Sequence, residues 1–375
     1  MVPYLAARPD RQEGWNCFTE DGHGAMRGGK ILFLKHPDGA RSADWLFAAD
    51  VPDTVFVTNV PKERRIVFLM EPPAIRKYSA GYLDQFGVAV SPYEIKDYSG
   101  RAIISNPCLG WFAGISTGST ERLDWFAETG TGETKQAGFF FEKLQDVREY
   151  KPSAKSRTIS IIVSLKNLCE GHAKRLAFLE ALKAHCGAKV DYYGREFNAV
   201  DDKLEAIAPY KYHIAIENSQ MENYWTEKLT DAWIGWSLPI YCGDSALRDR
   251  IPDPMGIEII DINDIPSSLK KIDDIVENDI YESRLEAIKK CRDWVIAESN
   301  PYEKVSRIIE SADSSVIGIP KLRRGILLRP AVNWCHISYF VFKFLSLLFN
   351  DKAWIWYLAY KEYKNRRRIR LHSDF

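Results

Sequence analysis

Residues 210–244 read YKYHIAIENSQMENYWTEKLTDAWIGWSLPIYCGD. The apolar run predicts a buried strand at 212–218, a helix follows from about Thr226, and a second apolar run predicts a strand at 238–244. Strand, helix and strand in this order form the unit of a doubly wound parallel sheet. Ligands bind such sheets beyond the carboxyl ends of the strands, so the polar break before the helix is a candidate site.

The residues on both sides extend this pattern. TISIIVSLK (158–166) predicts another buried parallel strand, followed by a helix at 171–186. Further strands are expected at 189–194 and 257–264, and an amphipathic helix is expected at 281–297. These elements predict an α/β domain at 151–320.

An earlier α/β domain is expected at 1–150. Its predicted strands are short apolar runs separated by polar loops, at 30–36, 54–60, 64–73, 85–94 and 101–107. The polar segment EYKPSAKSR (149–157) contains Pro and Ser and predicts the linker between the domains.

Composition is that of a soluble globular protein, with 46% apolar and 27% charged residues among 375. Seven scattered cysteines without a C-x-x-C pair argue against a disulfide framework and a zinc site, and fit a reducing cytosol. The seven histidines show no metal-ligand spacing, so no metal is expected. Neither a G-x-G-x-x-G nor a Walker motif is present.

Polar groups gather where the 212–218 strand gives way to the helix. Glu217 and Asn218 end the strand, Thr226 is a plausible N-cap, and Glu227 and Lys228 occupy the first helical turn. Adjacent helical residues point about 100° apart, so Glu227 and Lys228 are expected not to face each other and to hold different parts of one ligand. The helix start and the lysine favour phosphate, and the carboxylate would accept hydroxyls, which together outline a nucleotide sugar. The alternative is an acidic helix start with a solvated lysine.

This stretch also resembles the donor-binding signature of the family 10 α-1,3/4-fucosyltransferases. That signature runs aromatic-Glu-Asn-Ser/Thr, then Asp-Tyr-x-Thr-Glu-Lys, then a small helix and Pro-Val/Ile-x-x-Gly. The sequence departs from it at Ile216, where an aromatic residue is usual, and at Asn223, where Asp is usual. The resemblance covers about 157–245 and, more weakly, 65–73.

The resemblance implies a GT-B fold, in which two Rossmann-like domains face a cleft. It also implies GDP-fucose as the donor, inversion at the sugar carbon and no required cofactor, a divalent cation being at most stimulatory. By this resemblance, Asn218, Tyr224, Glu227 and Lys228 fall at donor-contacting positions.

Arg175 is a further donor candidate. Phe178, Leu179 and Leu182 follow it at i+3, i+4 and i+7, which places the arginine on the core-facing side of its helix, in the first turn. A buried arginine needs an anionic partner, either an acidic side chain or a ligand. In the resembled family an arginine here contacts the donor diphosphate. Arg195 is a weaker candidate and is expected on the surface.

Glu71 is the candidate catalytic base. It follows the apolar run RIVFLM, and two prolines after it prevent a helix. This segment resembles the Glu-Ser-Pro element of the family, whose glutamate is the proposed base. Inverting transfer needs such a carboxylate to take the acceptor hydroxyl's proton. The alternative is a carboxylate that caps a turn.

The expected function is therefore transfer of L-fucose from GDP-fucose to a GlcNAc or Glc unit of a glycan acceptor. Another nucleotide sugar on the same fold, or a non-catalytic nucleotide-sugar sensor on the membrane, are the alternatives. A metal-dependent GT-A enzyme would need an Asp-x-Asp motif, and the nearest segments, at 200–202 and 261–264, lack convincing spacing.

The 321–375 tail is basic and aromatic. It has twelve Lys/Arg against three Asp/Glu, whereas the remaining residues have 39 against 48. Its apolar pieces, 338–349 and 353–360, are too short to span a bilayer but suit an anionic membrane surface. The alternative is that 340–349 packs on the protein. Some bacterial members of the resembled family end in a basic amphipathic segment. The tail thus predicts a cytoplasmic enzyme on the inner face of a bacterial membrane, acting on surface polysaccharide or lipopolysaccharide precursors.

Overall fold

The computed structural model describes residues 3–6, 17–34, 43–51, 56–107, 110–115, 141–152, 154–167, 169–313 and 326–328. The chain forms two compact units, Met1–Leu328 and Arg329–Phe375, and the second lies wholly outside the described residues. The tail at 321–375, for which membrane contact is expected, also lies outside the described residues, except for the backbone of 326–328. Within the described ranges, none of the helices has the length and apolar character that crossing a membrane requires.

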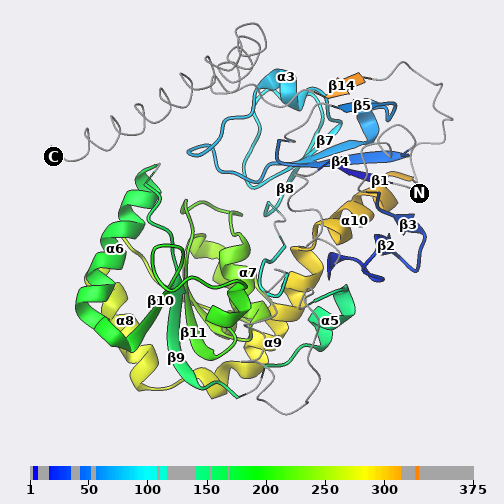
Figure 1. The fold of residues 1–375 in the computed structure, drawn as a ribbon. Coiled ribbons are helices and arrows are strands. Elements are labelled where there is room, and N and C mark those ends of the chain that lie inside the picture. The colour runs from blue at the N-terminus through cyan, green and yellow to red at the C-terminus, as the bar shows by residue number, and fades with distance from the viewer. Residues whose placement is uncertain are drawn as a thin grey trace, which may run out of the picture. The chain divides into compact units, whose positions relative to one another are not determined.

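Two five-stranded parallel sheets organise the first unit (Figure 1). The first has the order β1-β4-β6-β7-β8 and the second the order β10-β9-β11-β12-β13. The strands of the first sheet are β1 (Pro3–Ala6), β4 (Trp45–Ala49), β6 (Arg65–Phe68), β7 (Val88–Ser91) and β8 (Arg101–Ile104). Those of the second are β9 (Arg157–Ile162), β10 (Val190–Tyr193), β11 (Tyr210–Ile216), β12 (Leu238–Cys242) and β13 (Glu258–Ile259).

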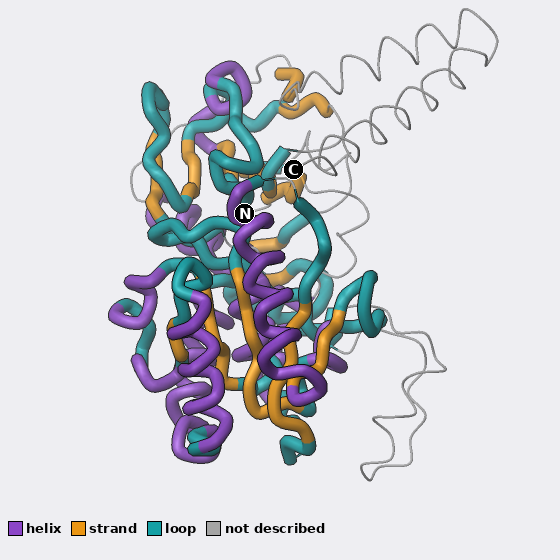
Figure 2. The backbone as a smooth tube through the Cα atoms, turned by 90° about the vertical axis from the view of Figure 1, so that its left-hand side faces the viewer, coloured by secondary structure: helices purple, strands orange, loops and turns teal. Residues whose placement is uncertain are grey.

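Helices cover the second sheet, α6 and α8 on one side and α7 and α9 on the other (Figure 1), and they lie alongside its strands (Figure 2). The described α-helices are α3 (Ala80–Leu83), α5 (Leu144–Glu149), α6 (Glu170–Cys186), α7 (Glu227–Ile234), α8 (Ile265–Glu277), α9 (Tyr281–Glu298) and α10 (Pro301–Asp313). The 3-10 turns are η2 (Lys62–Arg64), η3 (Gly187–Lys189), η4 (Lys203–Ala206), η5 (Ser245–Asp249) and η6 (Pro254–Gly256).

The predicted α/β class with two parallel sheets is confirmed, with differences in the first sheet. The run 54–60 gives β5 (Phe56–Thr58), which pairs with β14 (Ile326–Leu328) in a separate antiparallel pair. The run 30–36 yields only β3 (Ile31–Leu32), antiparallel to β2 (Ala25–Met26). The strands β1 and β4 replace them in the sheet, although the local patterns predict neither.

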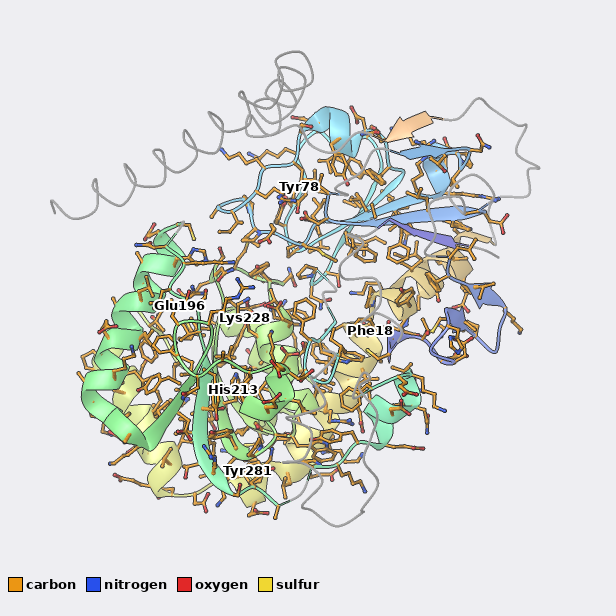
Figure 3. The ribbon with its side chains drawn as sticks, in the orientation of Figure 1. Phe18, Tyr78, Glu196, His213, Lys228 and Tyr281 are labelled. Atoms are coloured by element: carbon orange, nitrogen blue, oxygen red, sulfur yellow. The ribbon has the colours of Figure 1, made fainter. Side chains whose placement is uncertain are left out.

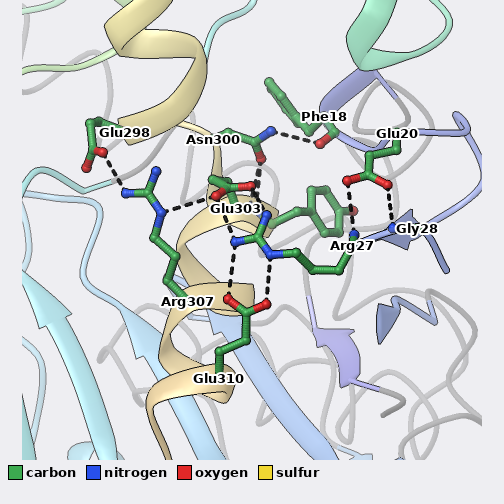
Figure 4. Close-up of polar contacts among 10 residues, drawn as sticks. Phe18, Glu20, Arg27, Gly28, Glu298, Asn300, Glu303, Arg307 and Glu310 are labelled. Carbon is green, nitrogen blue, oxygen red and sulfur yellow. Dashed lines mark hydrogen bonds and ion pairs between the residues drawn. The ribbon is translucent and has the colours of Figure 1, made fainter. Parts of the chain in front are cut away.

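Helix α10 returns to the first sheet after the second is complete. The Tyr302 ring packs edge-on against Phe33 and Phe47, with ring centroids 4.4 and 5.9 Å apart. The Arg27 guanidinium donates to both carboxylate oxygens of Glu303, at 2.8 and 2.9 Å, and also pairs with Glu310 (Figure 4). Helix α10 therefore packs against the core of the first sheet. The domain bounds 1–150, 151–320 and 321–375 remain a prediction.

Candidate functional site

The junction of β11 and α7 is built around a buried carboxylate. Glu217 follows β11 and is only 2% exposed. Its two oxygens accept from the backbone N–H and the hydroxyl of Thr226, at 2.7 and 2.8 Å. Thr226 in turn caps α7 by accepting from the Lys228 N–H, as the sequence predicts. Glu217 therefore fixes the helix start against the strand end.

Lys228 lies closer to its neighbours than the helical geometry predicts. Its Nζ lies 3.3 Å from Glu227, 3.6 Å from Glu217 and 3.1 Å from the Thr226 hydroxyl. The expectation that Glu227 and Lys228 do not face each other is wrong, because the flexible lysine stem folds back over the helix start. Lys228 and Glu227 thus form a charged pair at one edge of the sheet.

Electrostatics keep this pair ionised. Burial raises the pKa of Glu227, but Lys228 and Lys203 outweigh it and hold that pKa at about 2. Burial lowers the pKa of Lys228, but Glu227 and Glu217 outweigh it, so the pKa is raised. The Glu217 carboxyl has its pKa raised, chiefly by burial. A permanent cation therefore stands at the start of α7, where the helix dipole also favours an anion.

A cavity of about 440 Å³ opens beside this pair, at the carboxyl ends of β9 and β11. Lys228 and Glu196 lie at that edge of the sheet, and His213 lies deeper within it (Figure 3). Five cationic side chains line the cavity: Lys166, Arg175, Arg195, Lys203 and Lys228. Its acidic lining residues are Glu196, Glu227 and Asp231. A cavity of this size and polarity suits a phosphorylated ligand.

Three of these cations have no acidic partner in the described part of the chain. Lys203 pairs with Asp231 at 2.8 Å, and Lys228 pairs with Glu227. For Lys166, Arg175 and Arg195, no carboxylate of the described residues lies within ion-pair distance. The cavity lining thus carries an uncompensated positive charge, which an anionic ligand would neutralise.

Arg175 is buried, at 5% exposed, as its helical spacing predicts. It is the sixth residue of α6 rather than part of the first turn, because the helix already begins at Glu170. Its guanidinium donates to the Asn218 side-chain oxygen at 2.8 Å and to the Ser164 carbonyl at 3.1 Å. Its buried Nε has no hydrogen-bond partner among the described residues. The guanidinium is therefore held in place by neutral oxygens with its charge unpaired.

The other predicted donor residues lie around the same junction. Asn218 lines a second cavity of about 260 Å³, together with Ala74. Tyr224 is 1% exposed, and its pKa is raised by burial and by Glu217 and Glu71. Asn223, where the sequence departs from the signature, has φ +61°, a left-handed conformation that both Asn and Asp tolerate.

Glu71 follows β6 and is half-buried. Burial and the neighbouring Asp50 carboxylate raise its pKa, whereas Arg76 and Lys228 lower it. The charge of Lys228 therefore acts on the Glu71 carboxyl. Glu71 makes no ion pair among the described residues, and its raised pKa suits a proton acceptor near neutral pH.

Gly171 permits the close approach of α6 to the strand end. A Cβ atom at this position would lie 2.1 Å from the Asn218 carbonyl oxygen. We expect Gly171→Ala to displace Asn218 and to destabilise the protein by about 1–3 kcal/mol, the usual cost of overpacking. Thermal unfolding measures this. Gly81→Ala in α3 is the matched control, since nothing lies within 4 Å of its Cβ position; equal melting temperatures for the two variants would contradict the prediction.

One group of potentially metal-ligating side chains occurs in the described part of the chain. The ligand atoms of His185, Cys186 and Asp273 lie within 4.8 Å of one another. None of the three lines the 440 Å³ cavity. His185 and Asp273 already pair with each other at 2.6 Å, which accounts for their proximity.

Comparison with known families matches residues 152–283 to the C-terminal model of glycosyltransferase family 10 (fucosyltransferase). The matched residues contain β9 to β13 and all five donor candidates, Arg175, Asn218, Tyr224, Glu227 and Lys228. Glu71 lies outside them.

Curated relatives resemble the chain over a short stretch. A putative fucosyltransferase-like protein of Arabidopsis thaliana is 34% identical over 87 residues, covering 22% of this chain and 17% of the relative. Human 4-galactosyl-N-acetylglucosaminide 3-alpha-L-fucosyltransferase FUT6 is 35% identical over 77 residues, covering 20% and 21%. The chain therefore aligns with only about a fifth of the length of these relatives.

Solved structures resemble the chain over more of its length and at low identity. An α1,3-fucosyltransferase with GDP-fucose covers 85% of this chain and 93% of its own, with a TM-score of 0.46 and 16% identity. The T4 phage BGT in complex with UDP and Mn²⁺ covers 81% and 99%, with a TM-score of 0.40 and 8% identity.

Sequence reasoning missed two lysines and underrated Arg195. Arg195 is exposed as expected but lines the cavity, and Lys166 and Lys203 lie beside it. Each of the three lies outside the junction of β11 and α7, so no local sequence pattern links it to the site. The available signal was position, since Lys166 ends one predicted strand and Arg195 follows another, at the edge of the sheet where ligands bind.

Proposed function

We propose that the protein is an inverting fucosyltransferase, which moves L-fucose from GDP-fucose to a hydroxyl of a GlcNAc or Glc unit in a glycan. The observation that carries the proposal is a set of cations around one cavity, Lys166, Arg175 and Arg195, for which the described ranges offer no acidic partner. The cavity lies within the residues that match the family 10 model. A diphosphate supplies the charge that this cavity lacks. The GT-B arrangement of two sheets is part of the same proposal.

In the proposed reaction, Arg175 and Lys228 hold the donor diphosphate. The cations stabilise the negative charge that develops as GDP leaves, so the proposal includes no cofactor and no general acid. Glu71 takes the proton from the attacking acceptor hydroxyl. The transition state resembles an oxocarbenium ion, as in glycoside hydrolysis. Asn218, Tyr224 and Glu227 orient the donor.

The glycosidic linkage that the enzyme forms does not follow from the donor that it binds. The chain matches a human enzyme named as a 3-alpha-L-fucosyltransferase and a Pan troglodytes enzyme named as a 4-alpha-L-fucosyltransferase, at 35% and 34% identity. The matched stretches thus do not separate the two linkages. An acceptor array with labelled GDP-fucose identifies the acceptor.

Calorimetry tests the donor. We expect GDP-fucose to bind more tightly than UDP-sugars, because the signature resembles that of GDP-fucose enzymes. GDP-mannose is a comparison for the sugar, and EDTA should leave donor binding unchanged. Tighter binding of a uridine sugar than of either guanosine sugar would contradict the donor assignment.

Peripheral membrane association through residues 321–375 remains part of the proposal and rests on the sequence alone. The basic and aromatic composition of the tail supports it. It would place the enzyme on the inner face of the membrane, where lipid-linked or surface glycan precursors are available. Co-sedimentation with anionic vesicles, full-length against a chain ending near Pro330, is the corresponding measurement.

A further inference from the structure

Asp50 stands next to Glu71 in the first sheet. Asp50 directly follows β4, and Glu71 follows the neighbouring parallel strand β6, so both lie beyond carboxyl strand ends. The Asp50 N–H donates to the Phe68 carbonyl at 2.9 Å. Asp50 has φ +61°, in the left-handed region that Asp and Asn enter more readily than other residues with a side chain.

Three side chains converge on Asp50 from the segment that follows Glu71. The Tyr78 hydroxyl donates to one carboxylate oxygen and the Arg76 guanidinium to the other, each at 2.5 Å. The Tyr82 hydroxyl donates to the Asp50 carbonyl at 2.6 Å. Burial and Asp50 raise the pKa of Tyr78, so this phenol stays protonated and remains a donor.

Tyr78 also contacts the backbone of Glu71. Its hydroxyl oxygen accepts from the Glu71 N–H at 3.2 Å while its proton goes to Asp50. A continuous chain of hydrogen bonds therefore joins the Asp50 carboxylate, the Tyr78 hydroxyl and the Glu71 main chain. Two prolines after Glu71 stiffen the intervening loop.

We propose that Asp50 is the positioning residue of the catalytic base, which it holds in place through the Tyr78 hydroxyl. This inference rests on the proposed role of Glu71. The charged groups that face the Glu71 carboxyl are Asp50 and Arg76 from the first sheet, and Glu227 and Lys228 from α7. Burial is the largest cause of the raised pKa of Glu71, and Asp50 is the second.

The sign of the pH effect follows from these charges. Glu71 acts as a base only when it is deprotonated, so activity falls as the pH drops through its pKa. Removing the Asp50 charge also leaves Arg76 uncompensated, and both changes favour the carboxylate form of Glu71. The acid limb of the kcat/KM profile should therefore move to lower pH in Asp50→Asn.

Two variants separate charge from orientation. Asp50→Asn should lower kcat by about tenfold or more through misplacement of the base and should shift the acid limb. Tyr78→Phe should lower kcat to a similar extent but leave the acid limb in place, because it removes a neutral hydroxyl. GDP affinity should be unchanged in both. Asp84→Asn, an exposed change near α3, is the matched control and should behave as wild type.

A second measurement does not depend on turnover. The Glu71 carboxyl is titrated by NMR with ¹³C-labelled glutamate, and its signal is assigned by its loss in Glu71→Gln. We expect a lower titration midpoint in Asp50→Asn than in wild type. An unchanged midpoint, together with unchanged kcat, would overturn the role of Asp50. Full turnover in Glu71→Gln would instead overturn the base assignment, so the two failures are distinguishable.

Discussion

Replacement of Glu71 by glutamine is expected to lower kcat by about 10²–10⁴-fold, the usual contribution of a positioned general base. Glutamine keeps the size and the hydrogen-bonding capacity of the side chain but cannot take a proton. GDP-fucose affinity should stay within a factor of about two, because the proposed donor cavity is lined by residues between 161 and 231 and not by Glu71. Steady-state kinetics and calorimetry on the same preparation measure both quantities.

The control for this variant is Glu94→Gln, an exposed carboxylate that follows β7 in the same sheet. It should leave kcat unchanged. A Glu71→Gln enzyme with wild-type kcat would show that Glu71 caps a turn and is not the base. A protein with GDP-fucose affinity but no transfer to any acceptor, in wild type and variant alike, would favour the sensor alternative.

Arg175→Ala is expected to weaken GDP binding by at least tenfold. A charge-assisted hydrogen bond contributes about 1.5–3 kcal/mol, which corresponds to about 10–150-fold in affinity. The GDP affinity of Arg175→Lys should fall between those of Arg175→Ala and wild type, because lysine keeps the charge but lacks the planar guanidinium group. Calorimetric titration with GDP measures all three proteins.

Two controls test whether a loss of GDP binding in Arg175→Ala is specific to the proposed diphosphate site. Lys189→Ala removes an exposed cation of the same domain that does not line the cavity, and should bind GDP as wild type does. Thermal unfolding of Arg175→Ala checks the fold, since the variant leaves oxygens of Asn218 and Ser164 without their donor.

Lys228→Ala should weaken GDP binding in the same range. Unchanged GDP affinity in both the Arg175 and the Lys228 variant would exclude the proposed diphosphate site.

The second sheet was predictable because its information is local. Buried parallel strands have continuous apolar sequences, and the 158–166, 212–218 and 238–244 runs each overlap a strand. The Thr226 cap involves residues two positions apart, and the core-facing side of Arg175 follows from helical spacing. Interactions of this kind involve residues only a few positions apart, so the local sequence predicts them.

The first sheet was less predictable because its partners are distant. β1 begins with a proline and lies at the sheet edge, and β4 ends in two alanines, so neither shows a strong strand pattern. β5 pairs with a segment some 270 residues later. Pairing with distant strands, rather than local propensity, assigns β1 and β5 to their sheets.

By itself, the sequence determined the class of the fold, the strand–helix unit at 210–244 and the donor candidates around it, since periodicity, caps and strand ends are properties of neighbouring residues. The tertiary structure alone decided which cations share the cavity, that Lys228 folds back onto Glu217 and Glu227, and that Asp50 reaches Glu71 through Tyr78. These contacts join groups from separate elements, or depend on the rotamer of a flexible side chain. Only the folded chain brings those atoms within hydrogen-bond distance, so no pattern along the sequence records them.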